Sequence, residues 1–135
     1  MPLGTEGHVG DGWLLRIVNF TADADSAVAA AKSSNRAPPA GQRYIVVAAQ
    51  LRYVGTDAAA GRDPGFVMIR VVSPDGPSHS TSEAGATPPP ADRTNVSDST
   101  FVGNLVYLVP IADAAHVTVF ASADFGQTET YFATT

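Results

Sequence analysis

The chain of 135 residues contains no cysteine. Disulfide bonds, thiolate metal sites and cysteine nucleophiles are therefore excluded. The absence of cysteine does not assign a compartment, because it only removes disulfides as evidence of export. The sequence also lacks any run of about 18 apolar residues, so it predicts no transmembrane segment.

Basic residues are few, and they are scattered along the chain. The 8 lysines and arginines stand against 13 aspartates and glutamates, which gives a net charge of −5. A chain of this sign repels a phosphate backbone or an anionic membrane surface. We therefore expect no nucleic-acid partner.

Short stretches of alternating apolar and polar residues dominate the rest of the sequence. Hydrophobic residues make up 44% of the chain, which is enough for one ordinary core in a single domain of this length. The alternation has the period of two that is typical of strands with one buried face, and Gly, Pro and Asp separate the stretches. This pattern predicts an all-β sandwich or barrel. The predicted strands are residues 13–20, 44–54, 66–73, 101–109, 116–123 and 130–133.

Two segments near the start of the chain depart from the strand pattern. Residues 25–32 are rich in alanine and predict one short helix, with Asp25 or Ser26 as its N-cap. Residues 1–9 are rich in glycine and lack an apolar run, so we expect a flexible N-terminal tail ahead of a single domain over residues 10–133.

A third departure lies in the second half of the chain. Residues 74–95 contain a Pro-Asp-Gly turn, several serines and threonines, and three consecutive prolines. Such a segment is too polar and too rich in proline to form regular structure for long. It predicts a long surface crossover with at most one short edge strand near residues 93–96.

Five short motifs follow one another along the chain. Each is weak by itself, whereas their order is more specific. Their glycines, prolines and aromatics have structural roles in a sandwich, such as the burial of an indole between two sheets. The motifs are Gly12-Trp13, Asn35-x-x-Pro38-Pro39-x-Gly41-x-x-Tyr44, Tyr53-Val54-Gly55, Gly103-Asn104-Leu105-Val106-Tyr107-Leu108-Val109-Pro110 and Tyr131-Phe132-Ala133.

With these motifs the chain resembles, over roughly Val9 to Ala133, the immunoglobulin-like domain of unknown function of exported actinobacterial proteins and lipoproteins, which is related to a small secreted mycobacterial antigen. The resemblance implies an immunoglobulin-like antiparallel β-sandwich of about seven strands, with no known catalytic residues. It also implies an extracellular or cell-surface location, with any membrane attachment made through a segment that precedes residue 1.

The histidines and acidic residues are the candidates for a metal site. No two of His8, His79 and His116 share a spacing that brings them together on one strand or helix, whereas zinc needs three or four convergent ligands. The acidic pairs Asp23/Asp25 and Asp57/Asp63 are candidates for calcium, although neither lies in an EF-hand pattern. We therefore expect no metal, and the sequence contains no nucleotide-binding glycine motif that would indicate another cofactor.

A hydrolase interpretation rests on Ser78-His79-Ser80, with Glu83 or Asp75 nearby. A catalytic triad needs fixed geometry, and neighbours on a polar loop rarely provide it. The sequence also lacks a Gly-x-Ser-x-Gly nucleophile elbow. We therefore expect no catalytic residues and no enzyme activity.

Apolar residues also occupy the strand positions opposite the predicted core. A sheet with one face in water places polar residues at most of these positions. Either these residues form an interface, or the short helix and the long crossover cover them; we favour the second interpretation. If an interface exists, its candidate residues are Val106, Leu108 and Phe120, together with His116.

Three functions remain open at this stage. The first is a non-catalytic extracytoplasmic binding or interaction module, a monomer or weak homodimer with an unknown protein or small-molecule partner. The second is a small-ligand carrier or hydrolase-type enzyme with a pocket between the sheets and His116 or His79 as its polar group. The third is a structural spacer of a larger surface protein. A filled core favours the first, and an apolar cavity of several hundred cubic ångströms with a histidine favours the second.

Overall fold

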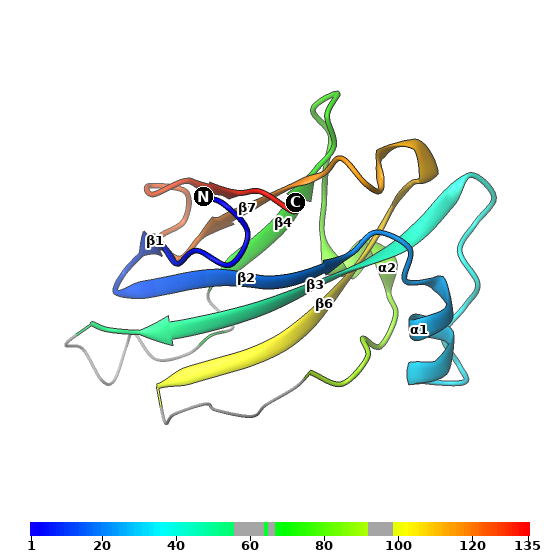
Figure 1. The fold of residues 1–135 in the computed structure, drawn as a ribbon, viewed down its shortest axis with the longest axis horizontal. Helices are drawn as coiled ribbons and strands as arrows, with labels where there is room; N and C mark the ends of the chain where they lie inside the picture. The colour runs from blue at the N-terminus through cyan, green and yellow to red at the C-terminus, as the bar shows by residue number, and fades with distance from the viewer. Residues whose placement is uncertain (56–63, 65–66, 92–98) are drawn as a thin grey trace.

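The computed structural model describes residues 1–55, 64, 67–91 and 99–135. These residues fold into two four-stranded antiparallel sheets that face each other as a sandwich (Figure 1). The predicted all-β sandwich is confirmed. The described residues form eight strands and two short α-helices, compared with about seven strands and one helix expected from the sequence.

The first sheet has the strand order β1-β2-β3-β6, and the second has the order β5-β4-β7-β8. β3 pairs with both β2 and β6, while β4 pairs with β7 and β7 with β8, which is the pairing of strands A, B, E and C, F, G in an immunoglobulin sandwich. The strands of the first sheet are Gly7–Gly10 (β1), Trp13–Thr21 (β2), Gln42–Tyr53 (β3) and Thr100–Pro110 (β6). Those of the second are Met68–Val72 (β4), Ser78–His79 (β5), Thr118–Ser122 (β7) and Thr130–Phe132 (β8).

The main core lies between the two sheets. Trp13, Tyr107 and Phe132 are its largest fully buried side chains. Val18 faces outward and is 44% exposed, and a β-bulge between Ile17 and Asn19 then shifts the alternation in β2, so that Phe20 packs against the core.

A second apolar cluster covers the outer face of the first sheet. Helix α1, Asp25–Ala31, places Val28 against Val46 and Val106. The predicted helix is therefore confirmed, and so is the interpretation that it covers apolar residues of the outer face. Asp25 does not cap the helix as predicted: its carboxylate accepts a hydrogen bond of 2.8 Å from the backbone N–H of Tyr44 and so ties α1 to β3.

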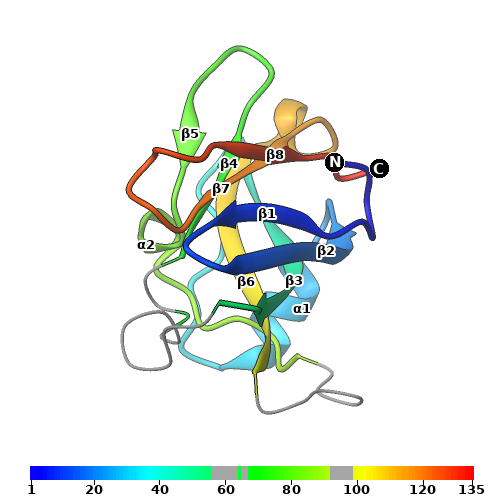
Figure 2. The same ribbon diagram turned by 90° about the vertical axis from the view of Figure 1, so that its left-hand side faces the viewer.

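The prediction of a flexible tail over residues 1–9 is wrong. β1 pairs with β2, and Val9 is fully buried. The N-terminal ammonium donates a hydrogen bond of 2.7 Å to the carbonyl oxygen of Tyr131, and the two termini lie side by side (Figure 2). Glycine-rich composition concealed a short strand whose buried positions are Gly7 and Val9.

The predicted crossover over residues 74–95 contains more structure than expected. It includes β5 and helix α2, Thr81–Ala84. Pro89 and Pro90 follow α2 in the chain. Their carbonyl oxygens accept hydrogen bonds of 3.2 and 3.1 Å from the Asn104 side chain, and these bonds hold the segment against β6. The edge strand predicted near residues 93–96 lies outside the described residues.

Candidate functional site

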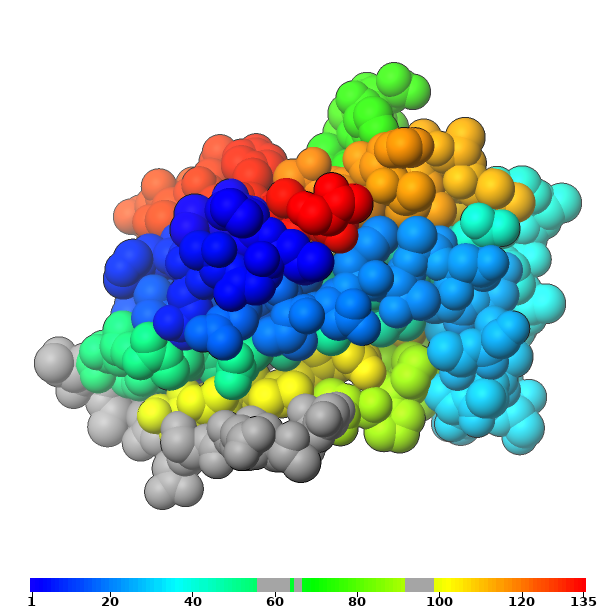
Figure 3. Space-filling model, viewed as in Figure 1, coloured from blue at the N-terminus to red at the C-terminus, as the bar shows by residue number. Residues whose placement is uncertain are grey.

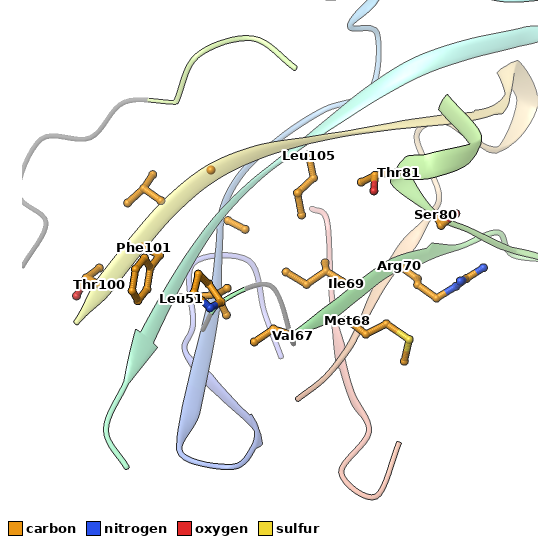
Figure 4. A pocket seen from close by; sticks show the side chains of 14 residues that line it. Leu51, Val67, Met68, Ile69, Arg70, Ser80, Thr81, Thr100, Phe101 and Leu105 are labelled. Carbon is orange, nitrogen blue, oxygen red and sulfur yellow. The ribbon is translucent and has the colours of Figure 1, made fainter. Parts of the chain in front are cut away.

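A cavity of about 680 Å³ lies between the two sheets, on the side where β6 is the edge strand of the first sheet (Figure 4). Leu51, Phe101 and Leu105 line it from the first sheet. Val67 and Ile69 line it from the second-sheet side. The volume falls within the range of about 300–1,000 Å³ that is usual for small-molecule sites.

Two small residues account for the empty space. Gly103 and Ala49 are direct register partners on β6 and β3, and both line the cavity. A Cβ atom at Gly103 would meet no other atom within 4 Å. Because neither position carries a large side chain, the first sheet leaves this part of the interior unfilled.

The aromatic ring of Phe101 lines the cavity and packs against aromatic residues of the core. The ring of Phe101 is partly buried, and its centroid lies 5.8 Å from that of Trp13. Trp13 in turn lies 5.3 Å from Tyr53. Trp13 is the single tryptophan of the chain, so its fluorescence reports on a ligand that displaces or contacts Phe101.

Polar side chains lie at both ends of the cavity. Figure 4 shows Ser80 and Thr81 at one end, and Thr100 beside Phe101 at the other. Arg70 leaves β4 on the side of its register partner Phe120, away from the first sheet, and its Nε atom donates a hydrogen bond of 3.2 Å to the Ser78 hydroxyl.

Tyr107 connects the two sheets next to this site. Its hydroxyl donates a hydrogen bond of 2.7 Å to the carbonyl oxygen of Ile69, a cavity-lining residue. Burial raises the pKa of the Tyr107 phenol, and the positive charge of Arg70 acts in the opposite direction. The phenol stays a neutral donor at physiological pH and fixes the spacing between β6 and β4.

Next to the cavity, three side chains stand in the order of a catalytic triad. The Ser73 Oγ atom lies 3.0 Å from His79 Nε2, and His79 Nδ1 lies 3.5 Å from a carboxylate oxygen of Glu83. A nucleophile must also face a substrate. Ser73 is only 3% exposed, and neither it nor His79 lines the cavity. We interpret the cluster as a brace that joins β4, β5 and α2, and so positions Ser80 and Thr81 at one end of the cavity.

The serines considered in the sequence have other partners. The Ser78 hydroxyl accepts from Arg70, and the Ser80 and Ser82 hydroxyls lie 2.8 Å apart. The structure thus brings His79 and Glu83 together as the sequence suggested, but with a different serine. Ser73 precedes the Pro-Asp-Gly turn, and only the return of the chain through that turn places it beside His79.

The predicted interaction surface is not a single surface. Val106 is 2% exposed and lies beneath α1, while Leu108 is partly buried in the same cluster. Phe120 belongs to the other sheet, where its ring lies 5.3 Å from that of Tyr131. His116 is exposed in the turn before β7. Val106 and Leu108 on β6 and Phe120 on β7 belong to opposite layers of the sandwich, and His116 lies outside both sheets.

The acidic residues considered for calcium have protein partners where the structure describes them. Asp23 lies 3.7 Å from Arg43, and Asp25 accepts from Tyr44. Asp57 and Asp63 lie outside the described residues. Within the described ranges, no three His, Asp or Glu side chains are grouped as metal ligands.

No helix in that same part of the chain has the length and apolarity needed to cross a bilayer.

Comparison with known proteins adds information on the fold. No family model and no curated protein matches the chain. The crystal structure of a conserved hypothetical protein from Bacillus anthracis is similar, with 12% identity, a TM-score of 0.50, and coverage of 95% of this chain and 92% of the other. An uncharacterised β-sandwich protein from Clostridium difficile has 16% identity, a TM-score of 0.47, and coverage of 96% and 89%. At 12% identity, the similarity to the Bacillus protein shows the fold alone, and the resemblance to the actinobacterial domain stays a prediction.

Proposed function

We propose that this protein is a non-catalytic binding module that holds a small, largely apolar molecule in the cavity between its sheets. The observation that carries the proposal is the cavity of about 680 Å³ with apolar walls. Ordinary protein interiors leave few voids larger than a water molecule. The cavity does not stabilise a domain of this size, and ligand binding is a reason for its presence.

The partial exposure of the wall residues supports the proposal. Phe101, Leu105 and Ile69 are large apolar side chains that face the interior yet are only partly buried. A bound apolar molecule would remove the remaining surface from water, at about 25 cal/mol for each Å² buried. None of the three histidines lines the cavity, and this favours a small-ligand carrier over a hydrolase-type enzyme.

The test is the binding of Nile red, a neutral apolar dye, to the wild-type protein and to Gly103→Val. The new side chain enters free space at a strand position, so the variant is expected to fold. It would occupy the cavity, and we expect at least a tenfold loss of dye affinity, measured by dye fluorescence. Thr118→Val is the matched control, because Thr118 lies on the outer face of β7 between the inward-facing Val117 and Val119.

Equal affinities of the wild type, Gly103→Val and Thr118→Val would place the dye elsewhere and reject the cavity as its site. Failure of the wild type to bind any apolar probe would reject the proposed function. An unchanged far-ultraviolet circular dichroism spectrum of both variants confirms that the comparison concerns binding rather than folding.

The extracytoplasmic location and the monomer or weak homodimer remain part of this proposal. The location is supported by the resemblance of the five motifs to exported proteins. Phe120 and Tyr131, the latter 50% exposed, offer the outer face of the second sheet as the contact of a weak dimer. Sedimentation equilibrium over a hundredfold concentration range tests the dimer, and a strict monomer would contradict it.

A further inference from the structure

An aromatic ring lies fully in solvent at the tip of the hairpin that joins β7 to β8. Phe125 is 92% exposed, the largest value among the exposed large hydrophobic side chains of the described residues. The tip projects at one end of the sandwich (Figure 1), and Phe125 does not line the cavity of its own molecule. A single exposed apolar side chain needs no explanation by itself, but the backbone of Phe125 makes this one unusual.

The backbone conformation of Phe125 is one that bulky side chains rarely adopt. Its φ angle is 56°, in the left-handed region, and that of Gly126 is 87°. Turns with two such residues in succession favour Asn-Gly, because asparagine and glycine tolerate a positive φ. Backbone strain of this kind persists only where the surroundings enforce it, and it collects at functional sites.

Hydrogen bonds within the hairpin hold the tip in this conformation. The Ser122 hydroxyl accepts a bond of 2.9 Å from the backbone N–H of Gly126 and donates one of 2.9 Å to the Asp124 carboxylate. The same carboxylate oxygen accepts a bond of 2.7 Å from the backbone N–H of Thr128. The carboxylate also packs against Gly10 in the turn after β1, where a Cβ atom would clash with it. The exposed ring is therefore carried on a fixed support.

The cavity between the sheets has the size and the lining to receive such a ring. Its apolar wall residues Phe101, Leu105 and Ile69 are only partly buried, so solvent reaches them. An apolar cavity of about 150 Å³ already accommodates benzene, and this cavity measures about 680 Å³. The molecule therefore carries an unfilled apolar site in one place and an unpartnered apolar ring in another.

We propose that Phe125 of one copy of this chain inserts into the cavity of a second copy. The inference rests on the cavity of the proposed function and adds a second occupant, which competes with the small molecule. The contact is heterologous, because the hairpin of one copy meets the cavity of the next, and it builds open chains or closed rings. It differs from a contact between two outer faces at Phe120 and Tyr131, which ends at a dimer.

The association is expected to be weak and to strengthen with salt. One inserted ring supplies only part of the surface of about 1,200–2,000 Å² that a stable interface buries. Each copy also carries a net charge of −5, so the copies repel one another. Raising NaCl from 20 mM to 500 mM should therefore increase the association, because salt screens this repulsion. An association that salt weakens would depend on charges and would contradict insertion of the ring.

The experiment is carried out in the Tyr131→Ser variant, which removes the contact between outer faces. Tyr131 is 50% exposed and does not line the cavity, so this variant is expected to fold and to keep the head-to-tail contact. Its average mass, measured by sedimentation equilibrium, should rise with concentration. Adding Phe125→Asn, which removes the ring and suits a positive φ, should weaken the association at least tenfold. Adding Gly103→Val, which fills the cavity, should do the same.

Mixing the two double variants is the decisive measurement. The variant with Phe125→Asn keeps its cavity, and the variant with Gly103→Val keeps its ring. An equimolar mixture is therefore expected to form a heterodimer with the affinity of the Tyr131→Ser parent and nothing larger. Nile red should lower the average mass of the parent, because the dye competes for the cavity.

The outcomes separate this inference from the proposed function. A Tyr131→Ser parent that binds Nile red yet stays monomeric would overturn the insertion of Phe125 and leave the proposed function intact. A mixture of the double variants that stays monomeric, or an association that Gly103→Val leaves unchanged, would overturn the insertion as well. Failure of the wild type to bind any apolar probe would overturn the proposed function itself.

Discussion

The two long edges of this sandwich differ in how their interior is filled. At the edge formed by β1 and β8, Val9 and Phe132 are fully buried, and the backbone N–H of Ala123 donates a hydrogen bond of 2.7 Å to the carbonyl oxygen of Val9. We call this the closed edge. At the opposite edge, where β6 faces β4, Phe101 and Leu105 are only partly buried and line the cavity. We call this the open edge.

One glycine at each edge shows how the difference arises. A Cβ atom at Gly7 on the closed edge would lie 3.1 Å from the ring of Phe132, whereas one at Gly103 on the open edge would meet nothing within 4 Å. At the closed edge the missing side chain makes room for a neighbouring ring. At the open edge it makes room for nothing in the protein. The same residue type thus completes the packing in one place and creates a cavity in the other. The space-filling view shows the N-terminal segment and the last residues closely packed against each other (Figure 3).

The largest expected effect compares one phenylalanine at each edge. Phe132→Ala should lower the free energy of unfolding by about 3–5 kcal/mol, because it removes a fully buried ring from a packed site. Phe101→Ala should cost about 1–2 kcal/mol, since that ring is only partly buried beside existing space. Urea denaturation measures both values. Equal losses would show that the open edge is packed as tightly as the closed edge.

A smaller effect of opposite sign is expected from the two glycines. Gly7→Ala should lower the free energy of unfolding by about 1–3 kcal/mol, because Phe132 or the neighbouring Met1 must shift. Gly103→Ala should leave it unchanged or raise it by up to about 1 kcal/mol, because alanine suits a strand interior better than glycine. Thermal and urea denaturation of the pair checks the difference, and a destabilised Gly103→Ala variant would contradict the open edge.

The smallest effect concerns the charges beside the closed edge. The Arg52 guanidinium donates two hydrogen bonds of 2.9 Å to Glu6 and holds the pKa of that carboxyl below its ordinary value of 4.5, while desolvation by burial opposes this shift. Because the folded-state pKa is lowered, the stabilisation is fully present above pH 4.5 and is lost as the pH falls through the folded-state value.

Glu6→Gln should therefore be slightly less stable than the wild type at pH 7, and the difference should shrink toward zero below pH 4.5. Urea denaturation at half-unit steps from pH 7 to pH 3 measures this dependence. Glu129→Gln is the control, since Glu129 forms no ion pair with a residue in the described ranges. A constant offset for Glu6→Gln at all pH values would show that the ion pair does not cause it.

Sequence reasoning succeeded where the alternation of side chains was long enough to measure. The strand 44–54 was predicted and spans Gln42–Tyr53, and the helix 25–32 spans Asp25–Ala31. It failed at β1, whose four residues include two glycines and give too short a pattern. It also could not locate the bulge at Val18, because a bulge reverses the alternation without any residue type that marks it.

The candidate site was the least predictable part of the molecule. From the sequence, Gly103 could be assigned only to a strand position that leaves room for a neighbour. It gives no motif, because the cavity depends on the register that sets Gly103 beside Ala49 and on the distance between the two sheets. Ser73 was missed for a similar reason: it lies six positions before His79, and a turn brings the two residues together.

The amino-acid order alone determined that this chain forms antiparallel strands with one apolar face toward a shared core, because alternation is a local property that short peptides already encode. Which edge of the core is filled, and which apolar residues the helix covers, were decided by the tertiary structure. These features arise from contacts between residues far apart in the chain, and the size of one side chain matters there only in relation to what stands across from it.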